Sequence, residues 1–250
     1  MAKERVLITV KTYPTLSRKY GETVCTAGMR PDGSWVRIYP VPFRRLDERE
    51  QYRKFDWIEA DLIKSKSDSR LETRHPADMH QLVPVAHLDT RDEWRERRRL
   101  VIETGKVHTR LEELIAAAKE NKLSLAVFKP KAIKEFITEE EDERDWNPKK
   151  MAEMRNLAAQ GDLFAEEWRK TFRVIPKLPY TFSYRFVDAD GRVATLQILD
   201  WEIGALYWSC FRRHGCKEAV ALEKVRMKYA DEFLKPICIC FSERRSNITL

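Results

Sequence analysis

Aromatic and basic side chains alternate along the first third of this sequence, and these residue types are suited to holding single-stranded nucleic acid. Bases stack on aromatic faces, while a cationic groove follows the phosphates. We therefore predict a basic aromatic β-surface that reads single-stranded or modified nucleic acid. Trp35 and Tyr39 are the predicted stacking residues, and the predicted phosphate contacts are Arg37, Arg44, Arg45, Lys64, Lys66 and Arg70. A simpler interpretation stays open, in which both aromatic rings pack a core edge and the arginines are solvated.

Acidic residues suggest a second kind of chemistry, because paired carboxylates hold the metal ions of many nucleases. Asp200 and Glu202 flank a tryptophan, and Asp56, Glu59 and Asp61 cluster around one predicted strand. Their spacing is not the Asp, Glu-x-Lys pattern of metal-dependent nucleases, and such residues are also common in turns and helix caps. A metal-dependent nuclease or phosphodiesterase is therefore the competing hypothesis. No catalytic residue is assigned, and whether the chain is an enzyme stays open.

Histidine and cysteine spacings predict neither a metal site nor a cofactor. His75 and His80 are five residues apart, and Cys238 and Cys240 have no second cysteine pair to complete a zinc site. The five cysteines are odd in number and scattered along the chain. This pattern fits a reducing cytoplasm better than a disulfide framework, so we expect a cytoplasmic protein.

The net charge of +7 is concentrated at the two ends of the 250-residue chain. Residues 1–74 hold 16 Lys and Arg against 11 Asp and Glu, and residues 210–250 hold 9 against 5, whereas the segment between them is slightly acidic. Localised positive charge favours a polyanion such as nucleic acid as the partner. A third hypothesis is a non-catalytic protein-interaction subunit. No apolar run approaches the roughly 18 residues that a membrane span needs, so no membrane partner is expected.

The order of predicted elements indicates an α+β fold. Turn residues Pro31, Asp32 and Gly33 separate two strand-like runs and predict a hairpin, and Asp188 to Gly191 predict another. A capping-box pattern begins at Thr109 and predicts a helix over residues 111–121. The remaining predicted strands cover residues 5–11, 57–64, 124–128 and 237–241, and the remaining predicted helices cover 92–103, 151–159, 201–211 and 217–234.

Three segments follow from this order. Residues 1–90 are predicted to form a small curved β-sheet or barrel, and residues 91–175 a central helical segment. Residues 176–250 are predicted to form a β-hairpin with a helix pair, which can be continuous with the helical segment as one domain.

Several strings resemble a family of uncharacterised bacterial proteins. They are Val6 to Thr12, Glu22 to Gly28, Ser34 to Pro40, Leu199 to Glu202 and Leu206 to Trp208. The resemblance implies an N-terminal module similar to small OB- or PUA-like β-barrels, and an association with mobile-element or phage-defence genes. It supplies no catalytic residue, and an association of this kind carries no mechanism.

Overall fold

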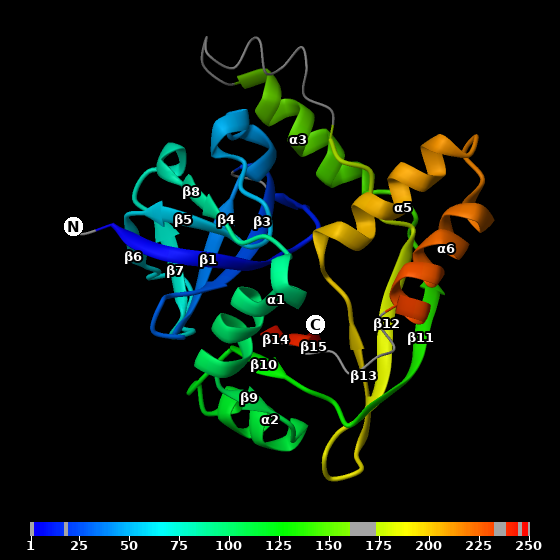
Figure 1. Cartoon of the computed structure of the whole chain (residues 1–250). Helices are drawn as coiled ribbons and strands as arrows, with labels where there is room; N and C mark the ends of the chain where they lie inside the picture. Colours follow the sequence, from blue (N-terminus) through cyan, green and yellow to red (C-terminus); the bar gives the residue numbers. More distant parts are fainter. Residues whose placement is uncertain (1–2, 18–19, 161–173, 233–238, 245–246, 250) are drawn as a thin grey trace.

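Two β-sheets organise the chain, and helices pack around them (Figure 1). The computed structural model describes residues 3–17, 20–160, 174–232, 239–244 and 247–249. The fold is α+β, as predicted, with a curled half-barrel sheet at the N-terminus and a second sheet with helices after it. No described helix is long and apolar enough to cross a membrane.

The first sheet contains strands from residues 4–87 only. In spatial order its strands are β6 (Leu62–Lys64), β7 (Thr73–Pro76), β4 (Trp35–Val41), β3 (Gly21–Met29), β1 (Glu4–Lys11), β5 (Asp56–Ala60) and β8 (Val83–His87), and β2 (Thr15–Ser17) pairs with β3. Short 3-10 turns connect them: η1 (Phe43–Arg45), η2 (Glu48–Glu50) and η3 (Met79–Gln81).

The predicted hairpin at Pro31 to Gly33 is confirmed as the β3–β4 turn. Gly33 has a φ of +83°, which glycine adopts without steric cost. The backbone N–H of Arg30 donates to the Ser34 carbonyl at 2.9 Å, and Asp32 Oδ1 accepts from the Ser34 N–H at 2.9 Å. Local turn chemistry therefore fixes the register of the two strands.

The second sheet takes strands from both remaining segments. Its order is β11 (Ala132–Glu140), β12 (Tyr180–Val187), β13 (Val193–Gln197), β15 (Asn247–Thr249), β14 (Ile239–Arg244), β10 (Leu125–Phe128) and β9 (Val107–His108). Residues 91–175, predicted to be helical apart from one short strand, thus contribute β9, β10 and β11. The predicted closing strand corresponds to β14, and its first two residues, 237–238, lie outside the described residues.

Strand β11 was not predicted, and its irregular pairing explains why. It pairs antiparallel with β12 along its length, but the register shifts between Ile133 and Glu135. A bulge of this kind interrupts the alternation of apolar and polar residues that indicates a strand. The acidic residues Glu139 and Glu140 at the end of β11 pair with Thr181 and Tyr180 of β12.

The helices lie near their predicted positions. They are α1 (Arg91–Arg98) continuing into the π-helical turn η4 (Arg99–Thr104), α2 (Leu111–Lys119), α3 (Pro148–Gln160), α5 (Trp201–Arg213), and α6 (Glu218–Arg226) continuing into η5 (Met227–Glu232). The predicted helix over 217–234 extends to residues 233–234, which lie outside the described residues.

The predicted capping box at Thr109 is wrong. No side chain next to α2 in sequence caps the helix, whose N-cap residue is Arg110. The buried carboxylate of Asp188, in the β12–β13 turn, instead accepts from the Leu111 N–H at 3.0 Å. Its other oxygen accepts from the backbone N–H of Arg192 at 2.9 Å, so one side chain stabilises both the predicted second hairpin and the start of α2.

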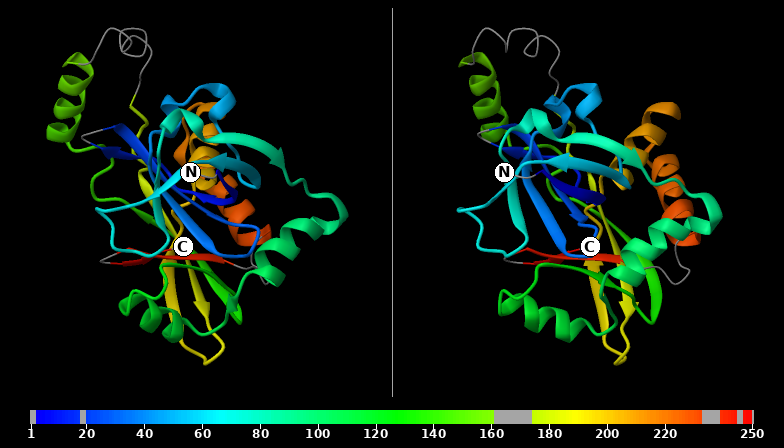
Figure 2. Two further views of the ribbon diagram at one scale, coloured as in Figure 1. Left: turned by 90° about the vertical axis from the view of Figure 1, so that its left-hand side faces the viewer. Right: turned by 60° about the vertical axis from the view of Figure 1, so that its left-hand side comes forward.

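Each sheet has its own core, and the two sheets meet along one side. Buried residues from Val6 to Leu82 form the core of the first sheet, and buried residues from Leu111 to Tyr229 form the core of the second. Figures 1 and 2 show β14 and β15 running between the first sheet and α2. The chain is therefore two folded units in contact, with side chains crossing between them.

The start of α5 makes the second contact between the two units. Trp201 packs against the first core, with its ring centroid 5.5 Å from that of Phe43. The Tyr13 N–H donates to the Leu199 carbonyl at 2.8 Å. Tyr13 lies directly over Gly204, where an added Cβ would come within 2.3 Å of the tyrosine ring.

Gly204→Ala is therefore expected to lower the free energy of unfolding by about 1–2 kcal/mol. The helix-propensity gain of roughly 1 kcal/mol is smaller than the overpacking cost against Tyr13, which reaches about 3 kcal/mol. Urea denaturation measures the change, with the exposed neighbour Ala205→Ser as the control. An increase in stability would contradict the close packing at this helix.

Candidate functional site

The predicted phosphate-contact residues do not all lie on one surface. Arg37 is buried, at 4% exposure, and crosses between the two sheets. Its Nη2 donates to both the carbonyl and the hydroxyl oxygen of Ser124 at 3.2 Å. Arg37 is therefore a structural contact between the two units.

Arg44 and Arg45 lie far from Trp35. Arg44 donates to both carboxylate oxygens of Glu22, at 2.7 and 2.9 Å, and Arg45 donates to the Tyr20 carbonyl. Glu22 is near the start of β3, whereas Trp35 pairs with Met29 at the end of the same strand. The rise per residue in a strand separates these positions by about 20 Å.

The remaining predicted residues lie on or near the β6–β7 connection. Lys64 and Lys66 are exposed, and Arg70 pairs with Asp68. Lys64 Nζ donates to the carbonyls of Arg70 and Leu71, both at 2.8 Å. Tyr39 is 39% exposed on β4.

Trp35 lines a cavity of about 370 Å³ between the two sheets, which we name the seam pocket. Its lining residues are Gly33, Ser34, Trp35, Leu71, Glu72, Lys106, His108, Lys122, Leu123, Leu125 and Ala126. Both units contribute, because the first three belong to the β3–β4 hairpin and the last three to the α2–β10 segment. Concave sites of this size between structural units are typical of ligand binding.

Hydrogen bonds between the units join residues 69–72 to residues 121–124 beside the seam pocket. Glu72 accepts from the backbone N–H of Ser124 at 2.7 Å and from its hydroxyl at 2.9 Å. Asn121 Nδ2 donates to the Ser69 carbonyl at 3.0 Å. Because both oxygens of Glu72 already accept hydrogen bonds, its carboxylate is held at the wall.

Cationic side chains border the seam pocket, although Lys122 is paired with Glu120 at 2.5 Å and the carboxylate of Glu72 is part of the wall. Lys106 and Lys122 are exposed at its lining, and burial together with Lys106 lowers the pKa of His108. Lys64 and Arg74 donate to the same carbonyl, that of Leu71, each at 2.8 Å. Desolvation and the charge of Arg74 lower the pKa of Lys64, as expected where cations cluster. The pocket thus has one aromatic face, Trp35, and a cationic border.

The sequence did not identify Lys106, His108 or Lys122 as site residues. All three belong to the middle segment, which carries no basic excess, and they reach Trp35 only because β10, paired with β9, packs beside β4. A sequence motif does not indicate which distant residues come close together when two sheets pack. Of the predicted residues, Trp35 lines the pocket, and Lys64 donates to the carbonyl of Leu71, which also lines it.

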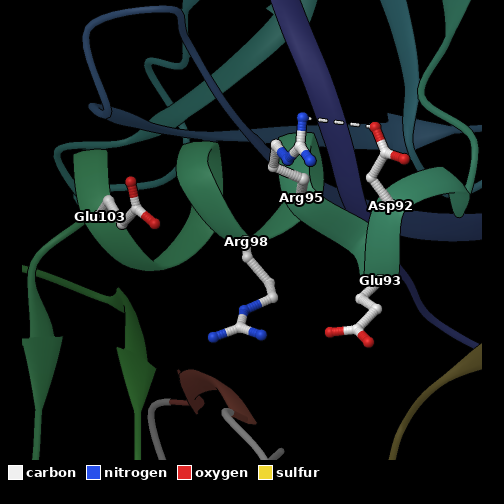
Figure 3. Close-up of a pocket in the computed structure, with 5 residues that line it drawn as sticks. All are labelled: Asp92, Glu93, Arg95, Arg98 and Glu103. Atoms are coloured by element: carbon white, nitrogen blue, oxygen red, sulfur yellow. Dashed lines mark ion pairs between the residues drawn. The ribbon is translucent and has the colours of Figure 1, made fainter.

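A second cavity, of about 350 Å³, opens beside α1 and η4. Figure 3 shows its lining residues, Asp92, Glu93, Arg95, Arg98 and Glu103, with Arg95 paired to Asp92 at 3.4 Å. The lining of this cavity has three carboxylates and two guanidinium groups, so its net charge is not positive. This cavity therefore lacks the charge that a phosphate requires.

The carboxylates Asp200 and Glu202 form a cluster with two lysines, which we name the lysine–carboxylate cluster. Lys54 Nζ pairs with Asp200 Oδ2 and lies 3.5 Å from Glu202 Oε2. Lys11 is 7% exposed, and its Nζ lies 3.7 Å from the Phe43 ring centroid and donates to the Tyr52 carbonyl at 3.3 Å. Asp200 also caps α5, accepting from the Glu202 N–H at 3.2 Å.

Burial and mutual charge shift the proton affinities in this cluster. Burial, then hydrogen bonding and repulsion from Asp200, raise the pKa of Glu202 to about 8. Burial would also raise the pKa of Asp200, but the ammonium of Lys54 lowers it. Burial lowers the pKa of Lys11 to about 8 against the attraction of nearby carboxylates. The cluster lies between the two units, so the shifted pKa values predict that the stability of their contact depends on pH.

The other predicted carboxylates do not join this pair as metal ligands. Asp56 contacts His87 Nδ1 at 2.6 Å, and Glu59 and Asp61 lie further along β5 and beyond its end. In the part of the chain that the structure describes, no three His, Cys, Asp or Glu side chains converge as metal ligands do. The cation that faces both Asp200 and Glu202 is the Lys54 ammonium.

The fold and the site define an α+β protein of two sheets with a pocket between them. The chain belongs to the family described as a domain of unknown function (DUF8757), which matches residues 106–239. A second domain of unknown function (DUF8758) matches residues 2–103. No curated protein and no solved structure matches the chain.

Proposed function

We propose that this protein binds single-stranded nucleic acid at the seam pocket. The supporting observation is the joint placement of Trp35, Lys106 and Lys122 around one concave site. An exposed base would stack on Trp35, and the lysines would contact phosphates on either side. Lys64 and Arg74 would extend these contacts along β6 and β7, which retains part of the surface predicted from the sequence.

Single strands suit this site better than duplexes. A half-buried indole in a pocket is accessible to a base only when that base is free of its stack and its pairing partner. The OB- or PUA-like character of residues 1–90 and the association with defence genes stay predictions. Cys25, Cys210 and Cys216 are free thiols, which supports the proposal of a reducing, cytoplasmic setting.

Trp35→Ala is expected to weaken binding to single-stranded RNA or DNA about tenfold or more. Stacking of one base contributes about 1–3 kcal/mol, and 1.4 kcal/mol corresponds to tenfold in affinity. Fluorescence anisotropy with labelled oligonucleotides measures the change. Tyr39→Ala removes an exposed aromatic ring from the same strand outside the pocket and should leave the affinity unchanged.

The lysines are tested by their effect on salt dependence. Lys106→Ala with Lys122→Ala should reduce the slope of log affinity against log salt by about 0.7 for each phosphate of a single strand that the variant no longer neutralises. Lys134→Ala with Lys224→Ala is the matched control, because it removes the same charge from β11, at the opposite edge of the second sheet, and from α6. If the seam-pocket and control variants bind alike, the proposal is wrong.

A further inference from the structure

A buried carboxylate orients a histidine at the opposite edge of the first sheet from β6. Asp56 and His87 are register partners in the antiparallel pair of β5 and β8. Asp56 Oδ1 lies 2.6 Å from His87 Nδ1, and Oδ2 accepts from the Arg53 N–H at 2.6 Å. Asp56 is 4% exposed, while the His87 side chain is 34% exposed.

This contact determines the role of each imidazole nitrogen. A carboxylate only accepts hydrogen bonds, so Nδ1 carries the hydrogen that faces Asp56 and Nε2 of the neutral ring is an acceptor. An imidazole held in this tautomer by a buried carboxylate is the arrangement of a general base. The charged groups near the His87 imidazole are Asp56, Arg97 and Asp89, and Arg53 lies beside Asp56.

Arg97 places a cation next to the accepting nitrogen. Its Nη2 donates to His87 Nε2 at 3.4 Å, and its Nε and Nη2 both donate to the Leu88 carbonyl. Within the described part of the chain, Nη1 makes no hydrogen bond. The guanidinium stacks 4.0 Å from the Phe55 ring centroid and 5.5 Å from that of Trp94, whose side chain is 48% exposed.

The sheet connects this group of residues to the seam pocket. Successive cross-strand partners run from Trp35 to Met29, Leu7, Trp57 and then Ala86, which precedes His87. Four strand spacings amount to about 20 Å. Met29, Leu7 and Trp57 are buried, the last two against Leu100 of η4, so a strand that contacts both places passes over the helical segment and not along this row. Nucleic-acid sites of this kind extend over about 4–16 nucleotides, which is long enough to span that distance.

We propose that Asp56, His87 and Arg97 form an acid–base site that cleaves RNA, an inference that rests on the proposed nucleic-acid binding. The 2′-hydroxyl of the RNA displaces the 3.4 Å contact from Arg97 Nη2, His87 Nε2 accepts its proton, and its oxygen bonds to the adjacent phosphorus. The bond from phosphorus to the 5′-oxygen breaks, and water protonates that oxygen. The imidazolium then returns its proton to solvent, leaving a 2′,3′-cyclic phosphate and a 5′-hydroxyl end.

The residues present select this reaction over other phosphoester chemistry. The 2′-hydroxyl supplies the nucleophile within the substrate, so the protein needs a base and a cation to stabilise charge on phosphorus. His87 supplies the base, and Arg97 Nη1 the cationic donor. Asp56 is a positioning residue, because it touches the imidazole and not the substrate. DNA lacks the 2′-hydroxyl and cannot undergo this step.

The test uses the full chain with end-labelled single-stranded RNA in the presence of EDTA. We expect cleavage that leaves cyclic phosphate ends, with a DNA strand of the same sequence intact. His87→Ala is expected to lower the cleavage rate at least 100-fold, the lower limit for loss of a general base, with the affinity for RNA retained. His80→Ala is the matched control, because His80 is also beside a carboxylate, at 3.4 Å from Glu50, but is 67% exposed.

Two further variants separate positioning from catalysis. Asp56→Asn should lower the rate less than His87→Ala and change its pH profile, because the amide can hold the ring without its charge. Arg97→Met should lower the rate while leaving that profile in place. Thermal denaturation confirms folding of each variant.

The outcomes distinguish the two proposals. RNA that binds in a Trp35-dependent way but stays intact overturns the acid–base site and leaves the proposed function standing. Failure to bind RNA at low salt overturns the proposed function itself. Cleavage that His87→Ala does not reduce shows that another group or a contaminant is responsible, and it also overturns the inference.

Discussion

Lys54→Met is expected to lower the free energy of unfolding by about 2–3 kcal/mol. Removing one partner of a buried ion pair costs about 3–5 kcal/mol, and partial exposure of this pair reduces the loss. Lys54 compensates the buried charge of Asp200, so its removal leaves that carboxylate without its cation where the two units meet, while Glu202, with a pKa of about 8, is mostly protonated at pH 7. Urea denaturation at pH 7 measures the difference.

A second substitution tests the cause of this loss. In Lys54→Met with Asp200→Asn the uncompensated carboxylate charge is gone, and Asn still caps α5 because its side-chain oxygen accepts as that of Asp does. Most of the stability should therefore return. Lys134→Met, at an exposed position on β11, should change stability by less than about 0.5 kcal/mol. A loss in Lys54→Met no larger than in this control would show that the cluster contributes nothing.

Local patterns predicted much of the fold because short-range chemistry determines those parts. The turn at Gly33 needs a positive φ, and the turn at Asp188 is stabilised by the Asp188 carboxylate. Turn residues in the sequence therefore predicted both hairpins. The start of α2 was placed correctly but for the wrong reason. Its cap is Asp188, 77 residues away, which no local pattern indicates.

The candidate site was less predictable because its parts come from separate segments. Aromatic and basic residue types marked Trp35 and Lys64, but the same reasoning included Arg37, whose guanidinium is buried against Ser124. A sequence pattern does not distinguish an arginine that contacts solvent from one that joins two sheets. Lys106 and Lys122 become relevant only once β9 and β10 lie beside the first sheet.

Stability is expected to pass through a minimum near pH 8 because of two opposite titrations. The pKa of Glu202 rises from 4.5 to about 8 on folding, so its contribution is full below pH 4.5 and is lost as the pH rises to 8. The pKa of Lys11 falls from 10.5 to about 8, so its contribution is full above pH 10.5 and is lost as the pH falls to 8.

The fall in stability below pH 8 and the rise above it, which we call the lower and upper limbs of the curve, differ in size because the two side chains differ in exposure. The Glu202 side chain is 41% exposed, so solvent screening reduces its contribution to stability. We expect a total loss of about 1–2 kcal/mol between pH 4.5 and 8, which is less than the roughly 1.4 kcal/mol for each unit of pKa shift that a fully buried group would give. Lys11 is 7% exposed, and its limb is expected to reach about 2–3 kcal/mol. Other groups titrate in the same range, so differences between variants isolate these two.

Glu202→Gln and Lys11→Met assign the limbs. The first should abolish the fall between pH 5 and 8, and it should also shift the Lys11 limb to lower pH, because the Glu202 carboxylate raises the pKa of Lys11. Lys11→Met should abolish the rise above pH 8 and leave the lower limb in place. Urea denaturation from pH 5 to 10 supplies the curves. If both variants parallel the unmodified protein across this range, the shifted proton affinities do not belong to this cluster, and the contact between the two units is insensitive to pH.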